Sequence, residues 1–371
     1  MIDIKTVKIV ENSNTVLGLR KPYTTVNVAS RTVLTDDIFS YVDFYFKKNK
    51  RKLVGSDGKE IKQNYLFYWH QAENFYRASK LLPIESAPLP MYYAMLNAAK
   101  AYILYVSKDV KGAIEALGSH GLHECKDNSD SPTSLGDIFI ERYDKGVFYY
   151  FSHLLDTDFE NKWPNRTKNV KYSIKELMGV LPFIHSAYVA TYSVKRKDEM
   201  FLPLPANVIP TYFYCSDRKI HLIIDLQKTY FKRNATSIPK EIMCAIPDEF
   251  DINKNNLFEL VSKEGYKKSD ISKKYFDYRK LFSYISADRR LWYLNKKCEK
   301  SYSSANKMSI SMAIMHRFSE IVRYKPEQMD TLLNGKENWI IREFVSLALD
   351  QFIDEIACEI TKQEIMQSRI K

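Results

Sequence analysis

The stretch MYYAMLNAAKAYILYVS, residues 91–107, carries the strongest structural signal in this chain of 371 residues. As far as Val106, only Asn97 and Lys100 interrupt its apolar and aromatic character. A membrane span needs about 20 predominantly apolar residues, so this shorter run predicts a buried helix of a globular protein. Residues 65–81 show the same helical spacing, and a short proline-containing link separates the two segments. We expect an antiparallel helical hairpin with a shared apolar seam.

The two ends of the chain are also predicted to be helical. An aspartate can cap a helix over residues 36–46. Near the other end, residues 303–324 form a helix that stops before Pro326, and residues 339–367 form another. Helices with an apolar face must bury it, so we expect the N-terminal and C-terminal helices to close into one bundle.

Strand signals gather in the middle of the chain. Residues 208–214 and 220–224 flank a Ser-Asp turn and predict the clearest β-hairpin. Residues 138–140 and 147–151 flank an Asp-Lys-Gly turn and predict a second hairpin. The fold class that follows is α+β, mainly helical, with a β-rich insertion between the two helical ends.

This pattern suggests a division of the chain into parts. Residues 1–35 form an extended arm or short strands, and residues 36–118 and 303–371 together form the helical bundle. Residues 119–302 form the β-rich insertion, which also holds helices and most of a basic, aromatic segment at 263–307.

Charge and cysteine content indicate the compartment. Lys and Arg number 56 against 45 Asp and Glu, which leaves a net charge of +11. The five cysteines are scattered and form no C-x-x-C pair, so neither a disulfide framework nor a zinc site is expected. The chain opens on MIDIK, without a signal pattern. We expect a cytoplasmic protein with no membrane partner.

The known signatures of cofactor chemistry are missing. The sequence contains no GxxxxGK[ST], GxGxxG, HExxH or GxSxG motif. His120 and His123 are the only close histidine pair, and their spacing in a loop is weak support for a metal site. We therefore expect no cofactor and no bound metal.

The segment 263–307 concentrates the basic charge. It holds ten lysines and three arginines against five acidic residues, together with nine aromatic residues. Cations neutralise phosphates and aromatic faces stack bases, so this composition favours contact with nucleic acid. A solvated lysine-rich face is the alternative. The cations chosen here as anion-binding candidates are Arg289, Arg290, Lys296 and Lys297.

Three further places carry candidate site residues. Lys100 lies in an apolar helix, where it either extends outward to water or faces an anion. His120 precedes a glycine, which allows a tight turn that presents the imidazole to a neighbour. On the late helix His316, Ser319 and Arg323 share one face, with Arg323 and Tyr324 at its end. These side chains suit an anion site, although an arginine at a helix C-terminus also has a purely structural explanation.

The order of four short motifs resembles the YaaC-like family of bacterial proteins. The motifs are YYAMLNAAKA at 92–101, HGL at 120–122, ELMGVLP at 176–182 and SEIVRYKP at 319–326. The tyrosine-rich helix followed by His-Gly also resembles the HEPN group of helical bundles, many of which cleave RNA in toxin and anti-phage systems.

The HEPN resemblance implies a mechanism. Catalytic members carry Arg, four to six residues, then His on a late helix, whereas here His316 precedes Arg323 and the standard pattern is not found. By the resemblance, a metal-independent ribonuclease would use Arg323 on the phosphate and His316 or His120 for proton transfer. A bundle without catalytic activity is the alternative.

Three function classes remain open from the sequence. The leading one is a defence or toxin-type component that engages nucleic acid, RNA rather than DNA. The second is a scaffold that binds a protein encoded nearby, and the third is a sensor in which Lys100, His120 and Arg323 surround a nucleotide or another anion. Self-association into a homo-oligomer is compatible with each of them.

Overall fold

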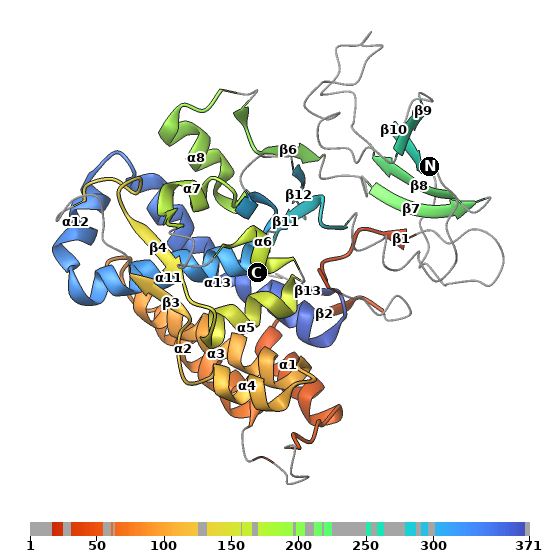
Figure 1. Ribbon diagram of the computed structural model, residues 1–371, viewed down its shortest axis with the longest axis horizontal. Coiled ribbons are helices and arrows are strands. Elements are labelled where there is room, and N and C mark those ends of the chain that lie inside the picture. Colours follow the sequence, from red (N-terminus) through yellow and green to blue (C-terminus); the bar gives the residue numbers. More distant parts are fainter. Residues whose placement is uncertain are drawn as a thin grey trace.

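The computed structural model in Figure 1 confirms an α+β fold that is mainly helical. One long buried helix organises it, with other helices packed around it and sheets on more than one side of this helical part. The structure describes residues 17–24, 31–54, 61, 64–124, 132–156, 158–164, 170–195, 198–204, 211–216, 219–224, 250–253, 258–262, 279–286, 291–295 and 301–367.

The central helix is α3 (Pro88–Val106), and 13 of its 19 residues are buried. Helix α2 (Tyr65–Ser79) packs along one side of it, while α11 (Lys307–Tyr324) and α13 (Asn338–Thr361) pack along others. Helix α1 (Ile38–Lys48) lies against α2 and α13. Helices from both ends of the chain therefore share one hydrophobic core, because the apolar surface of α3 needs cover on every side.

Shorter helices complete the helical part. Helix α5 packs against α3 and α11, so residues from the middle of the chain also enter the main core. The division into arm, bundle and insertion stays a prediction. The shorter helices are α4 (Val110–Ala116), α5 (Gly146–Leu155), α6 (Phe159–Lys162), α7 (Ile174–Met178), α8 (His185–Tyr192) and α12 (Pro326–Asn334).

Within the described residues the strands form four sheets. The predicted hairpin is confirmed as β7 and β8, which pair antiparallel in a five-stranded sheet of order β1-β7-β8-β10-β9 that lies to one side of the helices in Figure 1. The bounds of these strands are β1 (Leu17–Gly18), β7 (Thr211–Ser216), β8 (Lys219–Ile224), β9 (Phe250–Asn253) and β10 (Phe258–Ser262).

Three smaller sheets lie closer to the bundle. Two have three strands, in the orders β11-β12-β6 and β3-β4-β5, and the third is the parallel pair β13-β2, which joins the two ends of the chain. Their bounds are β2 (Val33–Thr35), β3 (Leu122–Glu124), β4 (Phe139–Arg142), β5 (Tyr172–Ser173), β6 (Phe201–Leu204), β11 (Phe282–Ile285), β12 (Leu291–Asn295) and β13 (Ile365–Gln367).

The second predicted hairpin is wrong. Strand β4 is present, but residues 147–151 belong to helix α5 and β4 pairs with β3 and β5 instead. A short apolar run does not distinguish a strand from a buried helix. Here Val147, Phe151 and Leu155 recur at helical spacing, and burial against α3 and α11 favours the helix.

The helix termini follow local chemistry. Asp37 caps α1 by accepting hydrogen bonds from the amides of Phe39 and Ser40. Helix α11 ends before Pro326 as expected, and this proline then begins α12, where its missing N–H costs nothing. Within the part of the chain that the structure describes, no helix has the length and apolar character that a membrane crossing requires.

Candidate functional site

A cavity of about 420 Å³ lies where α3, α11 and the turn before β3 meet. Of the predicted site residues it brings together five, from two segments almost 200 positions apart in the sequence. We call this cavity the histidine cleft. It is defined by Tyr92, His120, Lys145, His316, Ser319, Glu320, Arg323 and Tyr324.

The late helix supplies one wall of the cleft. His316, Ser319 and Arg323 recur at intervals of three and four residues, so they lie on one face of α11. His316 and Ser319 are buried, and Arg323 is exposed at the end of the helix. The side chain of Asn306 accepts a hydrogen bond from the amide of Met308 at the other end, which fixes where the helix begins.

A glycine turn supplies the opposite wall. Gly121 has φ +82°, in the left-handed region that favours glycine, which confirms the predicted tight turn. Backbone amides of α5 hold this turn: Val147 donates to the carbonyl of Ser119 and Phe148 to that of His120, each at 2.9 Å. His120 is thereby anchored through its own backbone to a buried helix.

Tyr92 orients the imidazole of His120. The tyrosine hydroxyl oxygen lies 2.7 Å from Nδ1, and the two rings stack with centroids 5.5 Å apart. Tyr92 is buried, and donation from its hydroxyl to Nδ1 of His120 is the arrangement that gives the hydroxyl proton an acceptor. In that arrangement the neutral His120 ring carries its proton on Nε2, as a donor available to a ligand.

His316 lies deeper in the same aromatic cluster. Its ring centroid is 4.9 Å from that of Tyr92 and 5.7 Å from that of His120. Burial, together with positive charge at His120, Arg317 and His123, lowers the pKa of His316 to about 3. Its Nδ1 has no hydrogen-bond partner among the described residues, and a carboxylate oxygen of Glu320 lies 3.7 Å away. The ring is neutral at physiological pH.

Cationic and aromatic groups form the rim. Tyr324 is 64% exposed, and the guanidinium of Arg323 lies 5.0 Å from its ring centroid. Lys145, also exposed, stands on the other side of the cavity. The Ser319 hydroxyl donates to the carbonyl of His316 at 2.6 Å, which engages its proton and leaves the oxygen as an acceptor. The rim therefore suits an anion attached to a planar ring.

The remaining candidates are Lys100 and four basic residues that lie outside the described part of the chain. Lys100 is half-buried, does not line the cleft, and has its ammonium 5.4 Å from the ring centroid of Tyr68. Its charge still reaches the cleft, because it contributes to lowering the pKa of His120. The basic candidates outside the described residues are Arg289, Arg290, Lys296 and Lys297.

Sequence reasoning missed Tyr92, Lys145 and Glu320 as site residues. Tyr92 stands two helical turns before Lys100 on the same face of α3, and Glu320 follows His316 by four residues. No sequence pattern indicated Lys145 as a site residue, because it reaches the cleft only where its loop crosses the glycine turn in the folded chain. Among the described residues, no three His, Cys, Asp or Glu side chains gather as a metal site would require.

Removing the charge of Lys100 is expected to raise the pKa of His120. Burial lowers this pKa first, and the ammonium of Lys100 disfavours the imidazolium further. In the variant Lys100→Gln, NMR titration should show His120 protonating at higher pH than in the wild type. Lys111→Gln removes an exposed charge from α4 and is the matched control. An unchanged His120 titration in Lys100→Gln would rule out this electrostatic link.

The profile of the YaaC-like protein family matches residues 38–360. This range contains every residue of the histidine cleft. No curated protein and no solved structure matches the chain. Because the match covers most of the sequence, the chain belongs to the YaaC-like protein family.

Proposed function

We propose that the histidine cleft binds one nucleotide of single-stranded RNA, with the phosphate at Arg323 and a base on the ring of Tyr324. The observation that carries this proposal is the convergence of Arg323, His120 and Tyr324 on one cavity. An arginine can bind a phosphate through two parallel hydrogen bonds, and an exposed tyrosine face stacks any base. Cavities of a few hundred Å³ hold ligands of nucleotide size.

The histidines support binding of a neutral or anionic group rather than a cation. His120 offers an N–H donor whose direction Tyr92 determines, and a donor in a partly desolvated place stabilises a phosphate oxygen. The nearby carboxylate of Glu320 lies 3.5 Å from Nη1 of Arg317, so its charge is partly neutralised. Positive charge therefore dominates the rim.

RNA cleavage is a second candidate function, favoured by the two imidazoles 5.7 Å apart. A neutral imidazole can accept the proton of a ribose 2′-hydroxyl as its oxygen attacks phosphorus, and the second can return a proton to the departing 5′-oxygen. His316 stays unprotonated at physiological pH and is therefore the candidate base in this scheme. A bound phosphate would raise the pKa of His120 and so allow it to serve as the acid.

The wider role proposed is that of a cytoplasmic component of an anti-phage or toxin-type system. The support for this role is the resemblance of the tyrosine-rich helix and His-Gly turn to HEPN bundles, and the relation to that group stays a prediction. A protein-binding scaffold and a nucleotide sensor remain the alternatives.

Arg323→Gln is expected to weaken binding of a short single-stranded RNA by about tenfold, the loss that about 1.4 kcal/mol of a charged hydrogen bond represents. Fluorescence anisotropy at several salt concentrations measures it, and the slope of log K against log salt should fall by about 0.7, one phosphate contact. Arg342→Gln, at an exposed position on α13, removes the same charge and should leave both values unchanged.

Three binding and cleavage measurements distinguish the candidate functions. Equal affinity for a mononucleotide and for the RNA would indicate a sensor. RNA fragments that disappear in Arg323→Gln and in His316→Gln would establish cleavage. Absence of RNA binding by the wild type at low salt would contradict the proposal, and the scaffold would then remain.

A further inference from the structure

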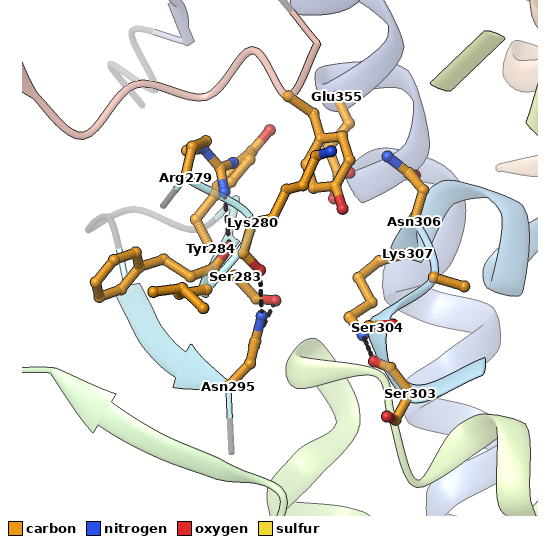
Figure 2. A pocket seen from close by; sticks show the side chains of 14 residues that line it. Arg279, Lys280, Ser283, Tyr284, Asn295, Ser303, Ser304, Asn306, Lys307 and Glu355 are labelled. Carbon is orange, nitrogen blue, oxygen red and sulfur yellow. Dashed lines mark hydrogen bonds between the residues drawn. The ribbon is translucent and has the colours of Figure 1, made fainter. Parts of the chain in front are cut away.

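A second cavity, of about 270 Å³, lies at the other end of α11 (Figure 2). It opens between the β11–β12 hairpin, the first residues of α11 and the middle of α13. Lys307 begins α11 here, sixteen residues before Arg323, so about 24 Å of helix separates this cavity from the histidine cleft. Nothing in the proposed function uses it. We call it the β11 cavity.

A buried arginine gives the β11 cavity its charge. Arg279 is 3% exposed, and its guanidinium donates to the carbonyls of Arg20 at 2.6 Å, Phe282 at 2.6 Å and Lys21 at 2.9 Å. Its Cζ lies 4.9 Å from the ring centroid of Trp292. Among the described residues no carboxylate lies within ion-pair distance of it. Neutral partners satisfy its hydrogen bonds but leave its positive charge in place.

Two lysines add to this charge. Lys280 is half-buried in the cavity wall, and none of the described carboxylates pairs with its ammonium. Lys307 faces it from the start of α11, where its ammonium donates to the carbonyl of Ser303 at 2.7 Å. Figure 2 shows the side chains of Lys280 and Lys307 on opposite sides of the space, with hydroxyl and amide groups around them.

Among the described residues that line the β11 cavity, Glu355 carries the one carboxyl group. Burial raises its pKa to about 7, and Nε2 of Gln351 donates to its oxygen at 2.6 Å. Near neutral pH this group is therefore partly uncharged, and among the described residues that line the cavity three cationic side chains accompany this one carboxyl group. The charged and titratable groups around Glu355 are Tyr23, Arg279, Lys280, Tyr284, Lys307, Asp354 and Glu359.

We propose that the β11 cavity binds a small phosphorylated ligand of sugar-phosphate size, with the phosphate between Lys280 and Lys307. Cationic side chains outnumber carboxyl groups in the described lining of the cavity, and this composition suits a phosphate dianion. The hydroxyl and amide groups of Ser283 and Asn295, which bond to each other at 2.8 Å, offer polar contacts for sugar hydroxyls. The volume leaves room for little more than one such sugar.

The ionisation of Glu355 determines how anion binding in the β11 cavity should change with pH. Below pH 7 its carboxyl is protonated and can donate to a phosphate oxygen, whereas above pH 7 the carboxylate repels a dianion. Affinity for a dianion should therefore fall as pH rises through 7. Sulfate is the suitable probe for this measurement, because a phosphate ester itself titrates near pH 6.

Isothermal titration calorimetry on the full chain tests the proposal. Ribose 5-phosphate should bind the wild type, and Lys280→Gln and Lys307→Gln should each weaken it about tenfold. Sulfate affinity should fall between pH 6 and pH 8 in the wild type and stay constant in Glu355→Gln, which keeps the side-chain shape. Lys111→Gln, exposed and remote, is the charge-matched control.

Two results would overturn the proposal. One is wild-type protein that binds neither ribose 5-phosphate nor sulfate at millimolar concentration. The other is binding that survives Lys280→Gln and Lys307→Gln unchanged, since the anion would then lie elsewhere. Arg323→Gln should leave binding at the β11 cavity intact, so failure of the RNA proposal and failure of this one are separate results.

Discussion

Replacing Lys21 by methionine is expected to lower the free energy of unfolding by about 3–5 kcal/mol. The ammonium of Lys21 lies 2.9 Å and 2.8 Å from the two carboxylate oxygens of Asp354, and the two residues are 6% and 1% exposed. Methionine keeps the volume of the side chain but leaves the Asp354 carboxylate buried without its cation. The hydroxyl of Tyr284, 2.7 Å from the same carboxylate, satisfies a hydrogen bond but not the charge.

Urea denaturation of three variants tests this expectation. Lys21→Met alone should show the full loss, while Lys21→Met combined with Asp354→Asn should recover most of it, because the double variant buries no charge. Lys47→Met removes the lysine of an exposed ion pair with Asp43 and should change stability by less than about 1 kcal/mol. A loss of similar size in Lys21→Met and Lys47→Met would show that the buried pair contributes no more than a surface pair.

The pair of Lys21 and Asp354 also illustrates what local sequence patterns cannot predict. Periodicity located α3 and α11 within a few residues, because each helix encodes its own apolar face. Nothing local joins two residues 333 positions apart, and the contact exists only after the N-terminal segment has docked on α13. Long-range pairs of this kind depend on the packing of the whole core.

The candidate sites likewise contain some features that local sequence patterns predict and others that they do not. The spacing of His316, Ser319 and Arg323 on one helix face could be predicted from the sequence, as could the glycine turn at His120. The role of Arg279 could not, since a count of cations cannot distinguish an exposed arginine from one buried against Trp292. The α5 error has a similar origin, because tertiary burial decided the structure of a run whose local pattern was ambiguous.

Gly121→Ala is expected to destabilise the protein by about 2–4 kcal/mol and to disrupt the histidine cleft. At φ +82° a side chain is strained in any surroundings. A Cβ at this position would also lie 2.5 Å from the carbonyl oxygen of Lys145 and 3.3 Å from Cβ of Phe148. The oxygen belongs to backbone that leads directly into α5, so it cannot yield as a flexible side chain would.

Gly118→Ala is the matched control in the same loop. A Cβ at Gly118 would meet only the carbonyl oxygen of Glu115, at 3.6 Å, an ordinary contact, and its φ lies outside the left-handed region. This variant should keep wild-type stability, or gain a few tenths of a kcal/mol through a less flexible unfolded chain. Thermal and urea denaturation of the two variants side by side isolate the effect of backbone conformation from that of the added methyl group.

Gly121→Ala should weaken RNA binding as well as stability, because the glycine turn holds His120 in position. Moving Gly121 away from Lys145 displaces the backbone whose carbonyls accept from Val147 and Phe148, and with it the imidazole that Tyr92 orients. RNA affinity in Gly121→Ala should fall at least as far as in Arg323→Gln, under conditions where circular dichroism shows the variant still folded. Wild-type affinity in a folded Gly121→Ala protein would mean that the position of His120 is irrelevant to the ligand, and Arg323 and Tyr324 alone would then have to account for binding.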